Sequence, residues 1–132
     1  MPQNHLLDSD VLIWFLRGNQ NAVALVNQLA RSAPPAYSAL SLLEIMSWVK
    51  PREEAPTQEF LQSLQLHPLD EAAALLAAQY TRDYRAKGRT LTLFDAAIAA
   101  TCVVNDLVLV TYNVKDFPVP ELKVYPIKTS KK

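Results

Sequence analysis

The sequence predicts an α/β fold, a three-layer α/β/α sandwich with a short, mainly parallel central sheet. Short apolar runs alternate along the chain with longer segments in which apolar residues recur every three or four positions, the spacing of amphipathic helices. Strands that are joined through helices pair in parallel, because a parallel connection has to cross the sheet. The 132 residues are enough for one core and show no internal repeat. We therefore expect a single domain over 1–132, with a short basic tail at about 127–132.

The first half of the chain divides at residues that cap or break helices. The apolar run 5–7 stops at Asp8, so a buried strand ends there and a helix follows as far as Gly18. Pro51 is expected to end a later helix, with a loop over 52–56. The elements expected here are a strand at 5–7, helices to about 17 and over 21–31, a strand at 36–38, and helices over 40–49 and 57–64.

The second half contains the longest predicted helix, which is rich in alanine, begins after Asp70 and ends at Gly88. Thr92 is a suitable N-cap for the next helix. The aliphatic run 107–111 is the clearest strand in the sequence. The elements expected here are a strand or turn at 66–69, helices over about 71–87 and 93–105, and strands at 107–111 and 122–125.

The composition is that of an ordinary globular protein, half hydrophobic and one fifth charged. Its single cysteine, Cys102, has no partner for an internal disulfide, which favours a reducing compartment. No amino-terminal stretch resembles a secretion signal, and no apolar run reaches the roughly 18 residues of a membrane span. We expect a cytoplasmic protein with no membrane segment.

Four acidic residues each lie where a predicted element meets a loop: Asp8, Glu44, Asp95 and Asp116. In α/β proteins the carboxyl ends of strands and the starts of the following helices meet at one edge of the sheet, where ligands bind. Carboxylates brought together there repel one another unless a cation is present, and hard oxygen ligands suit Mg²⁺ or Mn²⁺. The alternative for single residues is structural, since 41–44 and 92–95 both match the capping-box pattern. Together, the four acids predict a metal-dependent site that cleaves phosphodiester bonds.

The charge balance does not exclude a nucleic-acid substrate. The chain has 13 basic and 13 acidic residues, so its net charge is zero. Removing the four acids of the predicted site leaves nine acidic residues against 13 basic ones. Outside the site, the surface would therefore be basic by about four charges, which favours contact with phosphates.

These acids lie in four segments that resemble the PIN-domain family, and specifically the VapC-type toxin ribonucleases of bacterial toxin–antitoxin systems. The segments are 6–14, 38–45, 95–101 and 109–117. The resemblance implies a PIN-like fold, a Mg²⁺ or Mn²⁺ cofactor, and endonucleolytic cleavage of RNA by a water that the metal activates. It assigns catalytic and metal-binding roles to Asp8, Glu44, Asp95 and Asp116, with Thr111 and Asn113 as auxiliary polar residues. Asp10 falls where the family varies and is expected to be auxiliary at most.

The resemblance also implies partners: an RNA substrate, a cognate antitoxin protein and a second copy of the chain in a homodimer. Lys115 is a candidate RNA contact because it is adjacent to Asp116. Arg85 and Arg89 are further candidates, near the end of the longest helix. Their structural alternative is a solvated helix end, where cations interact favourably with the helix dipole.

Two other functions fit parts of the sequence. Asp8 and Asp10, followed by an aliphatic pair, resemble the nucleophile motif of haloacid-dehalogenase-type phosphatases, in which Asp8 would attack phosphate. That hypothesis leaves Glu44 and Asp95 unexplained. The second alternative is a catalytically inactive PIN-like module that binds RNA or a protein, although none of the four acids is missing here.

Overall fold

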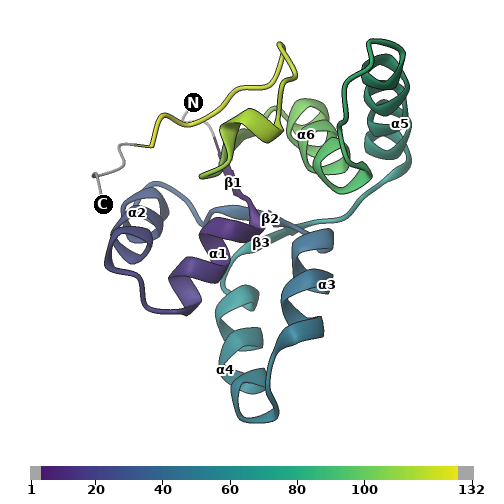
Figure 1. The fold of residues 1–132 in the computed structure, drawn as a ribbon. Helices are drawn as coiled ribbons and strands as arrows, with labels where there is room; N and C mark the ends of the chain where they lie inside the picture. The colour runs from purple at the N-terminus through teal and green to yellow at the C-terminus, as the bar shows by residue number, and fades with distance from the viewer. Residues whose placement is uncertain (1–3, 128–132) are drawn as a thin grey trace.

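The central sheet is short, as predicted, and its four strands within residues 4–127 are all parallel, where a mainly parallel sheet was expected. The computed structural model describes residues 4–127, and its strands are three residues long and have the order β3-β2-β1-β4 (Figure 1). Because the strands are parallel, their carboxyl ends lie at one edge of the sheet. The strands are β1 (His5–Leu7), β2 (Ala36–Ser38), β3 (Gln65–His67) and β4 (Val108–Val110).

Helices cover both faces of the sheet, which gives the predicted three layers (Figure 1). Within residues 4–127 the α-helices are α1 (Ser9–Leu16), α2 (Gln20–Ala30), α3 (Ala39–Trp48), α4 (Pro51–Gln62), α5 (Glu71–Ala86) and α6 (Leu93–Asn105). A 3₁₀-helix, η1 (Val114–Asp116), follows β4.

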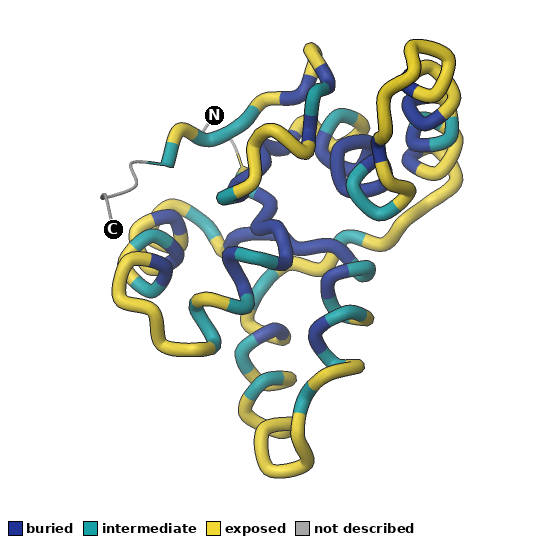
Figure 2. Tube along the Cα trace, in the orientation of Figure 1, coloured by how far each residue is buried: buried dark blue, intermediate teal, exposed yellow. Residues whose placement is uncertain are grey.

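The alternation of side chains along β1 and β4 divides the core into two clusters. Leu6 and Leu109 pack on one face of the sheet with α5 and α6. Leu7 and Val110 pack on the opposite face with α1, α2, α3 and α4. Figure 2 shows the burial of β1, β2 and β4 and of the inner helix faces, and the exposure of the turn between α3 and α4. The two clusters hold β1 and β4 from both sides and so fix the position of their carboxyl ends.

The prediction of a loop over 52–56 is wrong, because these residues belong to α4. Pro51 is the first residue of this helix, a position that needs no N–H donor and suits the fixed φ of proline. The backbone N–H of Lys50 donates to the Glu53 carboxylate over 3.1 Å, which closes the first turn. Pro56 lies inside the helix on its exposed side, where the carbonyl that loses its backbone donor is accessible to solvent.

The strand expected at 122–125 is reduced to one bridge, between Val124 and Leu109. The N–H of Leu109 donates to the Lys123 carbonyl, and the N–H of Tyr125 donates to the Leu109 carbonyl, both over 2.8 Å. Pairing does not continue because the chain after β4 turns towards α1, where the Tyr112 N–H donates to a carboxylate oxygen of Asp10. The two segments therefore diverge just beyond the bridge.

Two further expectations concern a membrane segment and the end of the chain. Within residues 4–127, no helix combines the length and the apolar character that a bilayer crossing requires. Of the basic tail expected at about 127–132, residues 128–132 lie outside the described part of the chain.

Candidate active site

The four acids predicted from the sequence line a single cavity of about 210 Å³. They come from the end of β1, from α3, from the first turn of α6 and from η1. Their convergence follows from the parallel sheet and the short helical connections, as expected. The complete lining is Asp8, Ser9, Asp10, Glu44, Phe94, Asp95, Asn113, Asp116 and Phe117.

Asp8 is the most buried of these acids, with 7% of its surface exposed. Its Oδ1 accepts a hydrogen bond from the backbone N–H of Ser9 over 2.8 Å and so caps α1. Its Oδ2 accepts from the hydroxyl of Thr111 over 2.9 Å. The pKa of Asp8 is raised to about 7, first by burial and then by the charges of Asp10 and Asp95, while the two hydrogen bonds oppose the change. A negative charge here is therefore costly unless a proton or a cation accompanies it.

Asp10 organises the segment that follows β4, although it was expected to be auxiliary at most. Its Oδ2 accepts from the backbone N–H of Tyr112 and from the side-chain amide of Asn113, both over 3.0 Å. Its Oδ1 is buried and has no hydrogen-bond partner. Burial raises the pKa of Asp10. The carboxylate thus holds Asn113 at the cavity and leaves one oxygen available for a cation or a proton.

Asp95 lies at the third position of α6, where the Thr92 hydroxyl accepts a hydrogen bond from its backbone N–H over 3.1 Å. The predicted N-cap is therefore confirmed, and it leaves the Asp95 side chain at the cavity. Burial is the main cause that raises the pKa of Asp95, and the charges of Asp116 and Glu44 add to it. These charge interactions show that acids from three different elements affect one another across the cavity.

Glu44 does not belong to a capping box, which corrects the structural alternative for this residue. The helix that contains it begins at Ala39 after the N-cap Ser38, so Glu44 lies in the second turn. Ser41 is fully buried instead and accepts a hydrogen bond from the Ser9 hydroxyl over 2.7 Å. This bond joins the starts of α1 and α3 and fixes the helix that presents Glu44. The capping-box interpretation gave Ser41 a different role, and nothing in the sequence indicated its bond to Ser9.

The remaining predicted residues divide into two groups. Thr111 and Asn113 lie at the site through their hydrogen bonds to Asp8 and Asp10. Three cations proposed as RNA contacts are not among the residues that line the cavity: Lys115, Arg85 and Arg89. The Arg89 guanidinium instead lies 5.4 Å from the ring centroid of Tyr84, and Lys115 is exposed on η1.

The donor set of the cavity fits a hard divalent cation. Its charged atoms are all carboxylate oxygens, the ligands that Mg²⁺ and Mn²⁺ prefer, and one of them on Asp10 is buried without a partner. Among residues 4–127, no three acidic, histidine or cysteine side chains form a group that could hold a metal ion by themselves. Mg²⁺ commonly keeps several waters and takes one or two protein carboxylates together with substrate phosphate. An ion in this cavity would therefore need ligands besides the carboxylates.

Comparison with known proteins gives the same family over most of the chain. The PIN domain family matches residues 5–119. Ribonuclease VapC10 of Mycobacterium tuberculosis is 36% identical over 116 residues, which are 88% of this chain and 87% of the relative. Ribonuclease VapC19 of the same organism is 31% identical over 120 residues, 89% of this chain and 96% of the relative.

Solved structures share the fold. A toxin–antitoxin complex from Klebsiella pneumoniae contains a chain with a TM-score of 0.75 and 27% identity, covering 94% of this chain and 100% of that chain. DNA-bound VapBC from Salmonella typhimurium has a TM-score of 0.81 at 21% identity, covering 94% and 98%. The phosphatase alternative gains no support from these similarities. The chain therefore belongs to the PIN domain family and, within it, resembles the ribonucleases named VapC.

Proposed function

We propose that the protein is a metal-dependent endoribonuclease, the toxin component of a toxin–antitoxin pair, acting on RNA in the cytoplasm. The observation that supports this most directly is the single cavity lined by Asp8, Glu44, Asp95 and Asp116. Burial and mutual repulsion raise the pKa values of Asp8 and Asp95, so their charged forms favour a bound cation. The names of the two Mycobacterium tuberculosis relatives support RNA as the substrate.

In the proposed reaction, Asp8 and Asp95 would bind Mg²⁺ or Mn²⁺ directly. Glu44 and Asp116 would bind it directly or through water, and the scissile phosphate would complete the site. When bound, the ion supplies Lewis acidity towards the phosphate and the attacking water. The hydroxyl of Thr111 and the backbone N–H of Ser9 keep the Asp8 carboxylate in one orientation. Asp10 keeps the amide of Asn113 at the edge of the cavity, where it can donate to a phosphate oxygen.

Cations outside the cavity are proposed to position the rest of the RNA. Lys115 is exposed one residue before Asp116, and Arg85 and Arg89 are exposed near the end of α5. Contacts of this kind with phosphates set the register of a nucleic acid and do not select its bases.

Exposed apolar side chains support the proposed protein partners. Trp14 on α1 is 43% exposed, and Leu43 and Trp48 on α3 are 69% and 83% exposed. Large exposed apolar side chains on neighbouring helices are typical of protein interaction surfaces. We propose that this surface contributes to binding of an antitoxin and to a homodimer. Light scattering over a wide concentration range tests the dimer, and a monomer throughout that range would contradict it.

The central experiment is cleavage of single-stranded RNA by the purified chain with Mg²⁺, with Mn²⁺ and with EDTA. We expect cutting with either metal and none with EDTA. Asp8→Asn and Asp95→Asn should each reduce the rate at least about a hundredfold, since each removes a charge from the site. Asp83→Asn is the matched control, because Asp83 is an exposed acid on α5 outside the cavity.

Three outcomes would count against the proposal. Full activity of the Asp95→Asn variant would show that the cutting does not take place in this cavity. RNA cleavage in EDTA would show that the reaction does not need a metal ion. RNA binding without any cutting would identify an inactive PIN-like module instead.

A further inference from the structure

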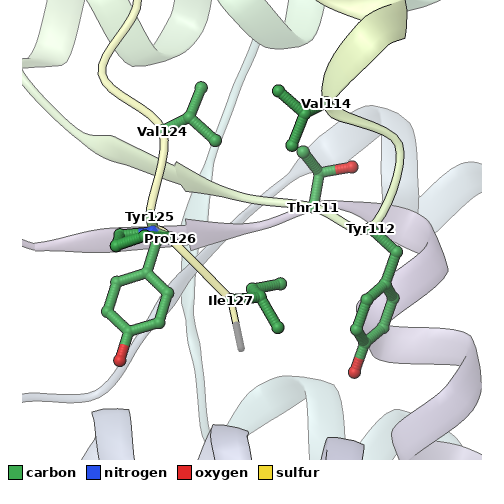
Figure 3. Close-up of a pocket in the computed structure, with 7 residues that line it drawn as sticks. All are labelled: Thr111, Tyr112, Val114, Val124, Tyr125, Pro126 and Ile127. Atoms are coloured by element: carbon green, nitrogen blue, oxygen red, sulfur yellow. The ribbon is translucent and has the colours of Figure 1, made fainter. Parts of the chain in front are cut away.

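A second cavity, of about 340 Å³, lies beside the acidic one and has no part in the proposed reaction. The rings of Tyr112 and Tyr125 stand on opposite sides of it, with Ile127 between them (Figure 3). Val114 and Val124 face each other at another side (Figure 3). Its complete lining is Thr111, Tyr112, Val114, Val124, Tyr125, Pro126 and Ile127. The cavity is thus mainly apolar, with two phenol groups.

This second cavity is a consequence of the way in which the sheet ends. β4 and the segment that contains Val124 pair only at the bridge between Val124 and Leu109. Beyond the bridge, the hydrogen bond from the Tyr112 N–H to Asp10 directs the first segment towards α1. On the opposite wall, Tyr125 is held by its backbone hydrogen bond to Leu109 and by an edge contact with the ring of His5. The centroids of these two rings lie 5.4 Å apart. Both walls are therefore held in place before any ligand binds.

The two cavities share one wall, the segment from Thr111 to Asp116. Asn113 and Asp116 line the acidic cavity, whereas Thr111, Tyr112 and Val114 line the apolar one. Asp10 binds the backbone of Tyr112 and the side chain of Asn113 with the same oxygen atom. A ligand with an anionic group at the acids and a flat, weakly polar group attached to it can therefore occupy both cavities.

We propose that the apolar cavity binds one unstacked base of the RNA, close to the phosphate that is cut. This inference rests on the proposed function, which places a phosphate at the acids. A nucleotide has the required combination, since its base is flat and attached through a ribose to the phosphate. Unstacked bases of single-stranded RNA bind to aromatic side chains, and the phenol hydroxyls can bond to base edges. A volume of about 340 Å³ is at the lower end of small-ligand sites and too small for a helix of a protein partner.

The test measures RNA binding rather than cleavage, in a chain that carries Asp95→Asn. Fluorescence anisotropy gives the Kd of a short single-stranded RNA and of versions in which each nucleotide in turn is replaced by an abasic ribose. We expect one position at which loss of the base weakens binding about tenfold, the magnitude of one base–aromatic contact. In the double variant Tyr112→Leu and Tyr125→Leu, the intact RNA should bind about tenfold more weakly, and the abasic change at that position should have no further effect.

Two further variants separate base binding from a general change of the fold. Tyr112→Phe with Tyr125→Phe keeps both rings and should keep the abasic effect. Leu75→Ala, an exposed apolar change on α5, should leave it unaltered. Melting curves show whether the double leucine variant is folded. If it is not, the variant Tyr112→Leu with Tyr125→Phe is compared with the double phenylalanine variant instead.

Each outcome decides the inference. It is overturned if no position shows an abasic effect, if the effect persists without the two rings, or if the leucine variant binds RNA normally and fails only to bind a protein partner. If the abasic effect is seen but the wild-type chain cuts no RNA, the base site is supported and the proposed nuclease function is contradicted. The two proposals can therefore fail separately.

Discussion

The hydroxyl of Thr111 donates a hydrogen bond of 2.9 Å to the Oδ2 atom of Asp8, from a position 103 residues further along the chain. The two residues follow neighbouring parallel strands, with Leu7 paired to Val110. Both are almost completely buried, with exposed fractions of 1% for Thr111 and 7% for Asp8. The register between β1 and β4 therefore sets the geometry of the most buried acid in the cavity.

Replacing Thr111 by valine keeps the shape of the side chain and removes the hydroxyl. The Oδ2 atom of Asp8 then lacks a buried donor, which we expect to lower the free energy of unfolding by about 1–3 kcal/mol. Urea unfolding at pH 8 measures this. Thr101→Val is the matched control, since Thr101 is equally buried but donates to a carbonyl of its own helix and should cost less. Equal losses in the two variants would show that the bond to Asp8 has no special role.

Asp10 is expected to act by positioning the segment after β4. Asp10→Ala removes the acceptor for Tyr112 and Asn113, so we expect faster hydrogen exchange at the Tyr112 amide and at least about a tenfold loss of RNA cleavage. Asp10→Asn keeps one acceptor oxygen and should restore slow exchange. Asp70→Ala is the control, because it removes the cap of α5 and should alter exchange only at Ala73 and its neighbours. Unchanged exchange at Tyr112 in Asp10→Ala would contradict the role.

The raised pKa of Asp8 predicts how stability depends on pH in the metal-free protein. Because the folded pKa of about 7 exceeds the ordinary value of 3.8, the folded state binds this proton more tightly than the unfolded state does. The contribution of Asp8 is fully present below about pH 4 and is lost as the pH rises to about 7. At pH 8 the free energy of unfolding of Asp8→Asn should therefore exceed that of the wild type by up to roughly 4 kcal/mol. At pH 4 the two free energies should differ little.

Urea titrations in EDTA at several pH values between 4 and 8 measure this difference. Asp83→Asn provides the comparison, since it makes the same change at an exposed acid on α5 outside the cavity. A gain for Asp8→Asn that is the same at every pH would contradict the assigned cause.

Metal binding should stabilise the folded chain above pH 7, where Asp8 is charged. A ligand that binds only the folded state at a hundred times its Kd adds about 2.7 kcal/mol. We therefore expect Mg²⁺ or Mn²⁺ to raise the Tm of the wild type, EDTA to reverse the change, and Asp95→Asn to show a smaller rise. Differential scanning calorimetry gives all three values. An identical rise in the Asp95→Asn variant would place the ion elsewhere.

The sequence predicted the helices and strands from local patterns, and the convergence of the acids followed from the parallel order of the strands. Asp70 and Thr92 cap helices as expected, since capping acts over three residues. The loop at 52–56 was wrong because a proline such as Pro51 can either end a helix or begin one, and only the Lys50–Glu53 contact decides between them.

Local patterns do not indicate which residues far apart in the sequence form hydrogen bonds with one another. The importance of Asp10 depends on partners that follow β4, and the bond between Ser9 and Ser41 joins two helices that are separated in sequence. The apolar cavity depends on where the pairing of Val124 stops, which no local pattern indicates. The catalytic and metal-binding roles of the four acids remain predictions.

The pairing of β1 with β4 has a consequence for the order in which this protein is made. On the ribosome, Asp8 emerges long before Thr111 and Asp116, and at about 5–20 residues per second the interval is roughly 5 to 20 seconds. Throughout that interval the nascent polypeptide has no β4 beside β1, so the acids have no common cavity. The site can therefore assemble only after the segment up to Asp116 has been translated and has left the ribosome.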